Sequence, residues 1–221
     1  MTVANPKTYL AELVNELKAT WPGNRTINIV CHGHSVPSGY FSTPVVDTFN
    51  AYPHLLHAAL KNRFPFAVIN VIVTAIGGEN SEQGAARFDN EVLTHRPDVI
   101  AIDYGLNDRG MGLDRARSAW ASMIERAQQR NIKLLLCTPT SDVTQEPGYG
   151  GEDKAKLPEH AEQIRRLAEE YGIGLVDSLA AFEAHQHRGE ALSDLLSAAN
   201  HPNRRGHEIV AGLLLRWFPW A

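Results

Sequence analysis

Five short apolar runs recur along the chain and mark its predicted strands. They are rich in β-branched residues and are continuous rather than alternating in polarity, which is typical of strands buried on both faces and hence of a mostly parallel sheet. The predicted strands cover residues 26–31, 67–73, 99–103, 132–138 and 174–176.

Segments with helical periodicity lie before, between and after these runs. The alternation predicts an α/β fold, a three-layer α/β/α sandwich around a five-stranded, mostly parallel sheet. The chain of 221 residues is long enough for one well-buried core and short for two, so we expect a single domain over 1–221, with 1–25 as an N-terminal helix and lead-in. The predicted helices are 8–20, 51–63, 81–95, 114–130, 158–171 and 204–217.

Charge is scattered along the chain, and the formal net charge is -4. There is no basic stripe for nucleic acid and no polybasic anchor for a membrane, so we expect a small neutral or weakly polar substrate as the partner. No apolar run approaches the ~20 residues of a spanning helix and no signal peptide is visible, which predicts a cytoplasmic protein. Cys31 and Cys137 close predicted strands and are interpreted as buried thiols. The oligomeric state stays open.

Polar residues follow the predicted strands at the points where each strand ends. Ser35 follows the first strand, Gly78 the second and Asn107 the third, while His201 precedes the last helix. Loops at the carboxyl ends of parallel strands meet at one edge of the sheet, where ligands bind. A serine hydroxyl is a poor nucleophile until a base takes its proton, so a serine and a histidine at this edge predict acyl-transfer chemistry.

Four sequence blocks, in order, resemble those of the SGNH hydrolases, also called the GDSL esterase and lipase family. The first is GHSVPSG at 33–39, similar to Gly-Asp-Ser-x-x-x-Gly with a histidine in place of the aspartate. The second is Gly78, with Gly77 as the other possible register. The third is GLND at 105–108, which matches Gly-x-Asn-Asp without change, and the fourth is His201 with the Pro-Asn that follows it.

The resemblance implies a flavodoxin-like SGNH hydrolase fold and a serine ester hydrolase. No cofactor is expected. Ser35 is the implied nucleophile, and His201 the general base that later returns the proton to the leaving alcohol. The implied oxyanion hole combines the backbone N–H groups of Ser35 and Gly78 with the side-chain amide of Asn107. Glycine suits its position because no Cβ blocks approach to the substrate.

One position departs from the family pattern. The family usually places an aspartate three residues before the histidine to orient its ring, and here that residue is Ala198. Three interpretations stay open: a dyad in which a backbone carbonyl holds the ring, an acid recruited from Asp194 or Asp177, or a chain that has lost activity.

Further residues near the blocks are candidates for substrate contact. Tyr40 lies in an irregular segment after Ser35, and His34 either touches the substrate or holds the loop. Asp108 follows Asn107 and could bind substrate, although capping a helix or fixing its loop is the favoured role. Several histidines invite a metal site, but no helical His-x-x-x-His with a nearby Glu occurs, so no metal is expected.

The leading hypothesis is an esterase that removes a small acyl group, acetyl, from a carbohydrate or similar polar alcohol. Its basis is the charged, Gly-rich segment 141–157, predicted to be a loop over the top of the sheet, together with the lack of a long apolar lid. The first alternative is a lipase, lysophospholipase or thioesterase acting on medium acyl chains. The second is a catalytically silent binding module that keeps the pocket.

Overall fold

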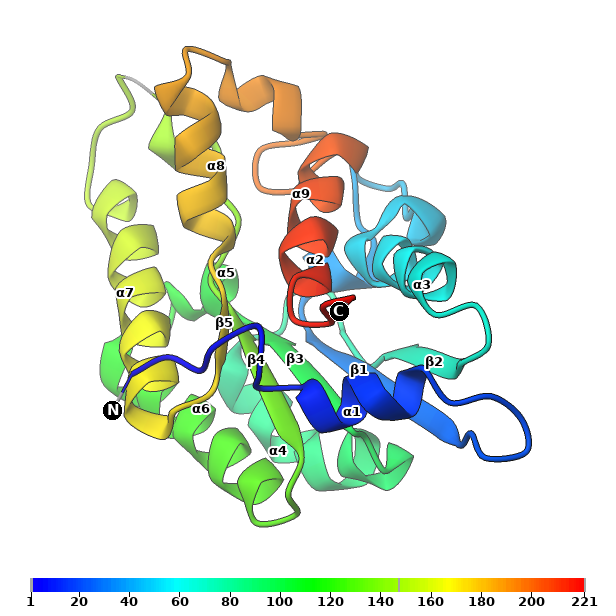
Figure 1. Ribbon diagram of the computed structural model, residues 1–221. Helices are drawn as coiled ribbons and strands as arrows, with labels where there is room; N and C mark the ends of the chain where they lie inside the picture. The colour runs from blue at the N-terminus through cyan, green and yellow to red at the C-terminus, as the bar shows by residue number, and fades with distance from the viewer. Residues whose placement is uncertain (1, 147, 221) are drawn as a thin grey trace.

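The computed structural model describes residues 2–146 and 148–220, and its centre is a parallel sheet with helices on both faces (Figure 1). The five strands run in the order β2-β1-β3-β4-β5, and every neighbouring pair is parallel. This arrangement confirms the predicted α/β sandwich. The strands are β1 (Thr26–Gly33), β2 (Val68–Val73), β3 (Val99–Asp103), β4 (Lys133–Cys137) and β5 (Gly174–Val176).

The helices are joined to the strands by short loops and 3-10 turns. The α-helices are α1 (Ala11–Leu17), α2 (Ser35–Ser38), α3 (Tyr52–Arg63), α4 (Ser81–Glu91), α5 (Gly105–Asp108), α6 (Leu113–Gln128), α7 (Asp153–Tyr171), α8 (Ser178–His187) and α9 (Arg204–Leu215). The 3-10 turns are η1 (Thr48–Asn50), η2 (Leu93–His95), η3 (Val143–Gln145) and η4 (Leu192–Leu195).

Alternate residues of each central strand enter two different cores. On β1, Ile29 and Cys31 pack with α1, α3, α8 and α9. Figure 1 shows these helices on one face of the sheet. Val30 points the other way and packs with α4, α6 and α7. Because helices cover both faces, the strands need apolar residues at successive positions, which explains their continuous apolar runs.

Besides the single-turn helices α2 and α5, which were not predicted, two longer helices differ from the sequence expectation. The structure begins α7 at Asp153, inside the segment predicted to be a loop. Pro158 has no N–H to donate to the Lys154 carbonyl one turn earlier, but the Gln145 side-chain amide donates to that carbonyl at 3.0 Å. The helix can therefore continue through the proline. Helix α8 was not predicted at all; the Asp177 side chain caps its first turn by accepting the Ala180 N–H.

The order of the strands creates one place where loops diverge. The chain leaves β1 toward the neighbouring β2, and it leaves β3 toward β4 on the other side. At such a switch point the two loops separate and leave room for a ligand at the carboxyl edge of the sheet. Ser35 and Asn107 follow these two strands. Within the described ranges, each helix is too short or too polar to cross a bilayer.

Candidate active site

Ser35 is the first residue of α2, in a tight turn at the end of β1. Gly33 lies so close to β3 that a Cβ there would be 2.4 Å from the Asp103 carbonyl oxygen. Gly39 ends α2 at φ +89°, a conformation that favours glycine. The turn leaves the Ser35 side chain 7% exposed at the carboxyl edge of the sheet.

His201 approaches Ser35 from the loop before α9. Its Nε2 lies 3.0 Å from Ser35 Oγ, and its Nδ1 lies 2.8 Å from the carbonyl oxygen of Phe41. Because a carbonyl oxygen can only accept, Nδ1 carries the ring proton in this arrangement, and Nε2 is left to accept the serine hydroxyl proton. The structure thus brings together the two residues from opposite ends of the chain in the geometry that a nucleophile and its base require.

The surroundings of His201 keep its ring neutral at physiological pH. Burial lowers the pKa of His201 below its ordinary value of 6.5, and His34 acts in the same direction, while the hydrogen bond to Phe41 partly opposes them. A base must be neutral to take a proton, so this direction suits His201 for proton abstraction at pH 7.

The two acids considered as partners of His201 lie elsewhere. Asp177 pairs with Arg165, at 2.8 Å from Nε, and accepts the Thr138 hydroxyl at 3.0 Å. The carboxylate of Asp194 is half exposed and lies 3.8 Å from His185. Within residues 2–146 and 148–220, neither hydrogen-bonds to His201. Of the three interpretations, the geometry therefore fits a ring held by a backbone carbonyl.

Gly78 is the candidate backbone donor in the loop that follows β2. It occupies a turn in which the Glu79 N–H donates to the Ile76 carbonyl at 3.3 Å, and its φ of +82° strains any residue with a side chain. In the described part of the chain, neither the N–H of Gly78 nor that of Ser35 has an acceptor within the protein. Gly77, the other possible register, packs against the Tyr40 ring, which lies 3.1 Å from where its Cβ would be.

Asn107 lies on α5, directly after β3. The Tyr104 carbonyl accepts its backbone N–H at 3.1 Å, and its side-chain Nδ2 donates to the Glu79 carbonyl at 2.8 Å. An amide nitrogen carries two hydrogens, so one remains for a substrate oxygen. The three candidate oxyanion donors thus come from the loops after three neighbouring strands.

Two of the candidate substrate contacts need correction because their side chains are buried. His34 is 1% exposed; its Nδ1 accepts the Val36 N–H at 3.2 Å, and its Nε2 lies 3.4 Å from Asp103 Oδ1. It holds the loop rather than reaching a substrate.

Asp108 has no exposed surface and accepts the Ser81 N–H and the Trp120 indole N–H, both at 2.7 Å. Asp108 therefore fixes the start of α4.

Tyr40 lies beside His201, and its contact with a substrate stays a prediction. It is half-buried, and its ring centroid lies 6.1 Å from that of His201. Two details were not predicted from the sequence: that Phe41 supplies the carbonyl that holds the His201 ring, and that Glu79 contacts Asn107. A backbone carbonyl carries no sequence signal, and a glutamate next to a glycine resembles any turn residue.

Among the described residues, no group of three or more His, Cys, Asp or Glu is arranged to hold a metal ion.

A parallel α/β sandwich with a serine and a histidine in contact at its switch point defines a class of protein, the serine hydrolases of α/β type. The GDSL-like lipase/acylhydrolase family model matches residues 31–209, so the chain belongs to that family. It is a carboxylic ester hydrolase with the SGNH fold.

Known proteins are similar to this chain in sequence or in fold. The chain is 25% identical to an acetylxylan esterase from Geobacillus stearothermophilus over 209 residues, which cover 85% of this chain and 90% of that one. The crystal structure of that esterase superimposes with a TM-score of 0.75 at 21% identity, over 88% of this chain and 95% of the other. An alpha/beta hydrolase enzyme from the metagenome of Lake Arreo, Spain, gives a TM-score of 0.74 at 23% identity, over 92% and 97%.

Proposed function

We propose that the protein removes a short acyl group, acetyl, from a carbohydrate or another polar alcohol through an acyl-serine intermediate on Ser35. The observation that carries the proposal is the contact of 3.0 Å between Ser35 Oγ and His201 Nε2. His201 takes the hydroxyl proton as Oγ attacks the ester carbonyl, then gives it to the leaving alcohol. Water repeats the cycle and releases the acid.

The site holds candidate hydrogen-bond donors for the negative charge that develops on the ester carbonyl oxygen. As the carbonyl oxygen becomes an oxyanion, the N–H groups of Ser35 and Gly78 and the second amide hydrogen of Asn107 donate to it. A donor of this kind stabilises a transition state by about 3 kcal/mol. Neither amides nor backbone N–H groups titrate in the working range, so this half of the site does not depend on pH.

The substrate class rests on two observations. The relative with 25% identity is an acetylxylan esterase, whose substrate is an acetylated polysaccharide. Tyr40 lies half-buried beside His201, and an aromatic ring at the rim of a site offers a flat face against which a sugar ring can pack. The medium-chain and silent-module alternatives become outcomes of the test.

The test compares initial rates on p-nitrophenyl acetate, p-nitrophenyl octanoate and acetylated xylooligosaccharides, the last followed by release of acetate. We expect acetyl esters to be cleaved faster than octanoate, and Ser35→Ala to abolish the activity. Ser42→Ala removes an exposed serine of the neighbouring segment and is the matched control. Preference for octanoate would favour a lipase-like enzyme, and no rate above that of Ser35→Ala on any ester would favour a binding module.

A further inference from the structure

We propose that Glu79, Arg87 and Tyr104 form a positioning cluster that sets the geometry of the two oxyanion donors Gly78 and Asn107. The inference rests on the proposed function, because it assigns the cluster to the support of that oxyanion hole. None of the three side chains reaches the reacting atoms, so they are positioning residues. They act through the loop after β2 and through α5.

The main chain of Glu79 joins the two donors. Its N–H closes the turn that gives Gly78 its φ of +82°, and its carbonyl accepts the Asn107 side-chain amide at 2.8 Å. The same residue therefore fixes the peptide after Gly78 and the direction of the Asn107 amide. A displacement of Glu79 moves both donors, and misplacement by about 1 Å can cost on the order of 100-fold in rate.

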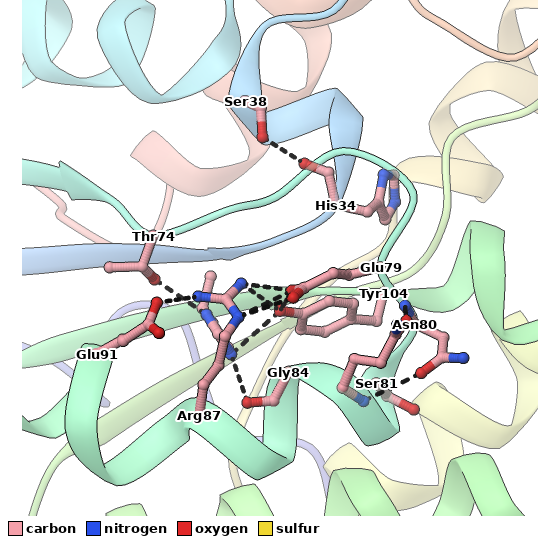
Figure 2. A network of polar contacts seen from close by, with 12 residues as sticks. His34, Ser38, Thr74, Glu79, Asn80, Ser81, Gly84, Arg87, Glu91 and Tyr104 are labelled. Atoms are coloured by element: carbon pink, nitrogen blue, oxygen red, sulfur yellow. Dashed lines mark hydrogen bonds and ion pairs between the residues drawn. The ribbon is translucent and has the colours of Figure 1, made fainter.

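The side chain of Glu79 is anchored by Arg87 of α4, as Figure 2 shows. Arg87 Nε lies 2.9 Å and Nη2 2.6 Å from Glu79 Oε2, and Nε also lies 3.1 Å from Oε1. The two side chains are 11% and 13% exposed. A planar guanidinium that contacts a carboxylate through two nitrogens fixes orientation as well as distance, and burial keeps solvent from screening the pair.

Tyr104 connects this ion pair to α5. Its hydroxyl lies 3.2 Å from Arg87 Nη2 and 3.4 Å from Glu79 Oε2, and its own carbonyl accepts the backbone N–H of Asn107. Asn107 is therefore linked to Glu79 by two routes. Its side-chain amide donates to the Glu79 carbonyl. Its backbone N–H donates to the carbonyl of Tyr104, whose hydroxyl contacts the Glu79 carboxylate.

The Tyr104 hydroxyl has a third partner, His32. The Tyr104 hydroxyl lies 3.1 Å from His32 Nε2, and His32 Nδ1 lies 2.9 Å from Thr74 Oγ1. Burial lowers the pKa of His32 to about 3, so the ring stays neutral and adds no second positive charge beside Arg87. A Cβ on Gly84 would lie 2.3 Å from the Tyr104 ring, so the glycine makes room for it.

The first experiment replaces Arg87 by Met, which keeps an unbranched stem and removes the guanidinium. We expect kcat on p-nitrophenyl acetate to fall by about 10- to 100-fold with little change in KM, since transition-state contacts are misplaced while ground-state binding is kept. Arg87→Lys keeps the charge without the two-nitrogen contact, and should recover part of the loss. Arg117→Met removes an exposed arginine paired with Glu170 and is the control, with kcat expected within about twofold of wild type.

The second experiment is a double-mutant cycle with Asn107→Ala. If Arg87 acts through the oxyanion donors, Arg87→Met should cost much less in the Asn107→Ala background than in wild type. Equal losses in both backgrounds, or an unchanged kcat in folded Arg87→Met, would overturn the proposal. Should Arg87→Met fail to fold by circular dichroism, Glu79→Gln, which keeps the size of the side chain, takes its place in the same cycle.

The two proposals fail in different ways. Loss of activity in Ser35→Ala and Asn107→Ala, with no effect of Arg87→Met or Glu79→Gln, would overturn the positioning cluster and leave the esterase mechanism intact. Full activity in Ser35→Ala would overturn the mechanism itself.

Discussion

His201 and Asn107 belong to the same candidate site, but the protein holds these two side chains in different ways. The His201 ring is oriented by one backbone carbonyl, that of Phe41, and no carboxylate approaches it within the described ranges. Asn107 is tied to Glu79, whose side chain pairs with the half-buried Arg87 and contacts the buried Tyr104. Charged side chains therefore lie around the residue that holds Asn107, whereas a main-chain oxygen holds the base His201.

The difference has a consequence for the reaction. A backbone carbonyl selects the tautomer of the imidazole as a carboxylate does, but it supplies only a partial charge to the imidazolium that forms in the transition state. Burial further disfavours that cation, as the lowered pKa of His201 shows. We therefore expect catalysis to depend strongly on the oxyanion donors. The following predictions test the comparison, beginning with the largest effect.

Removing the base should have the largest effect. His201→Ala removes the base 3.0 Å from Ser35 Oγ. His34 Nδ1, 3.5 Å from the same oxygen, already accepts the Val36 N–H, so we expect kcat/KM on p-nitrophenyl acetate to fall by on the order of 10⁴-fold or more. His187→Ala, which removes an exposed histidine at the end of α8, should stay within about twofold of wild type. A loss of less than 10-fold in His201→Ala would mean that another group takes the proton.

Removing the amide donor should have the next largest effect. For Asn107→Ala we expect kcat to fall by about 10²- to 10³-fold with KM little changed, because the donor acts on charge that exists only in the transition state. Asn90→Ala, at an exposed position of α4, is the matched control. A rise in KM at constant kcat would instead show that Asn107 binds the ground state.

A carboxylate added near His201 should have the smallest effect on rate, and it should move the pH profile. Because the neutral imidazole is the base, wild-type activity should fall only as pH drops through a pKa below 6.5. In Ala198→Asp the new negative charge favours the imidazolium and raises its pKa, so the acid limb should move to higher pH. Ala199→Asp adds the same charge at an exposed neighbour and controls for net charge. A limb that stays in place or moves to lower pH would contradict this.

The sequence predicts the strands, and it predicts that the site residues lie at one edge of the sheet. Buried parallel strands need continuous apolar runs, and polar residues directly after such runs can only lie at the carboxyl edge of the sheet. That pattern placed Ser35 and Asn107, and it gave His201, 166 positions from Ser35, a route to the same edge. The resemblance to the family motifs further implied that His201 Nε2 accepts the proton of the Ser35 hydroxyl.

Other features depend on contacts that no local pattern records. The partner of His201 is a main-chain oxygen of Phe41, which any residue could have supplied. Glu79 and Arg87 are eight positions apart, outside the three- or four-residue spacing of helical ion pairs, because one lies in a loop and the other on α4. Helix α7 runs through Pro158, and Gln145, from another segment, donates to the carbonyl that the proline leaves free.

The most direct test of the central claim is covalent labelling with an alkyl fluorophosphonate, followed by peptide mass spectrometry. Attack of Ser35 Oγ on phosphorus expels fluoride, and the hydroxyl proton passes to His201. We predict a single phosphonylated peptide that carries the label on Ser35 in wild type, no label in Ser35→Ala, and labelling slowed by orders of magnitude in His201→Ala. A label on another residue, or equal labelling of wild type and Ser35→Ala, would contradict the assignment of Ser35 as the nucleophile.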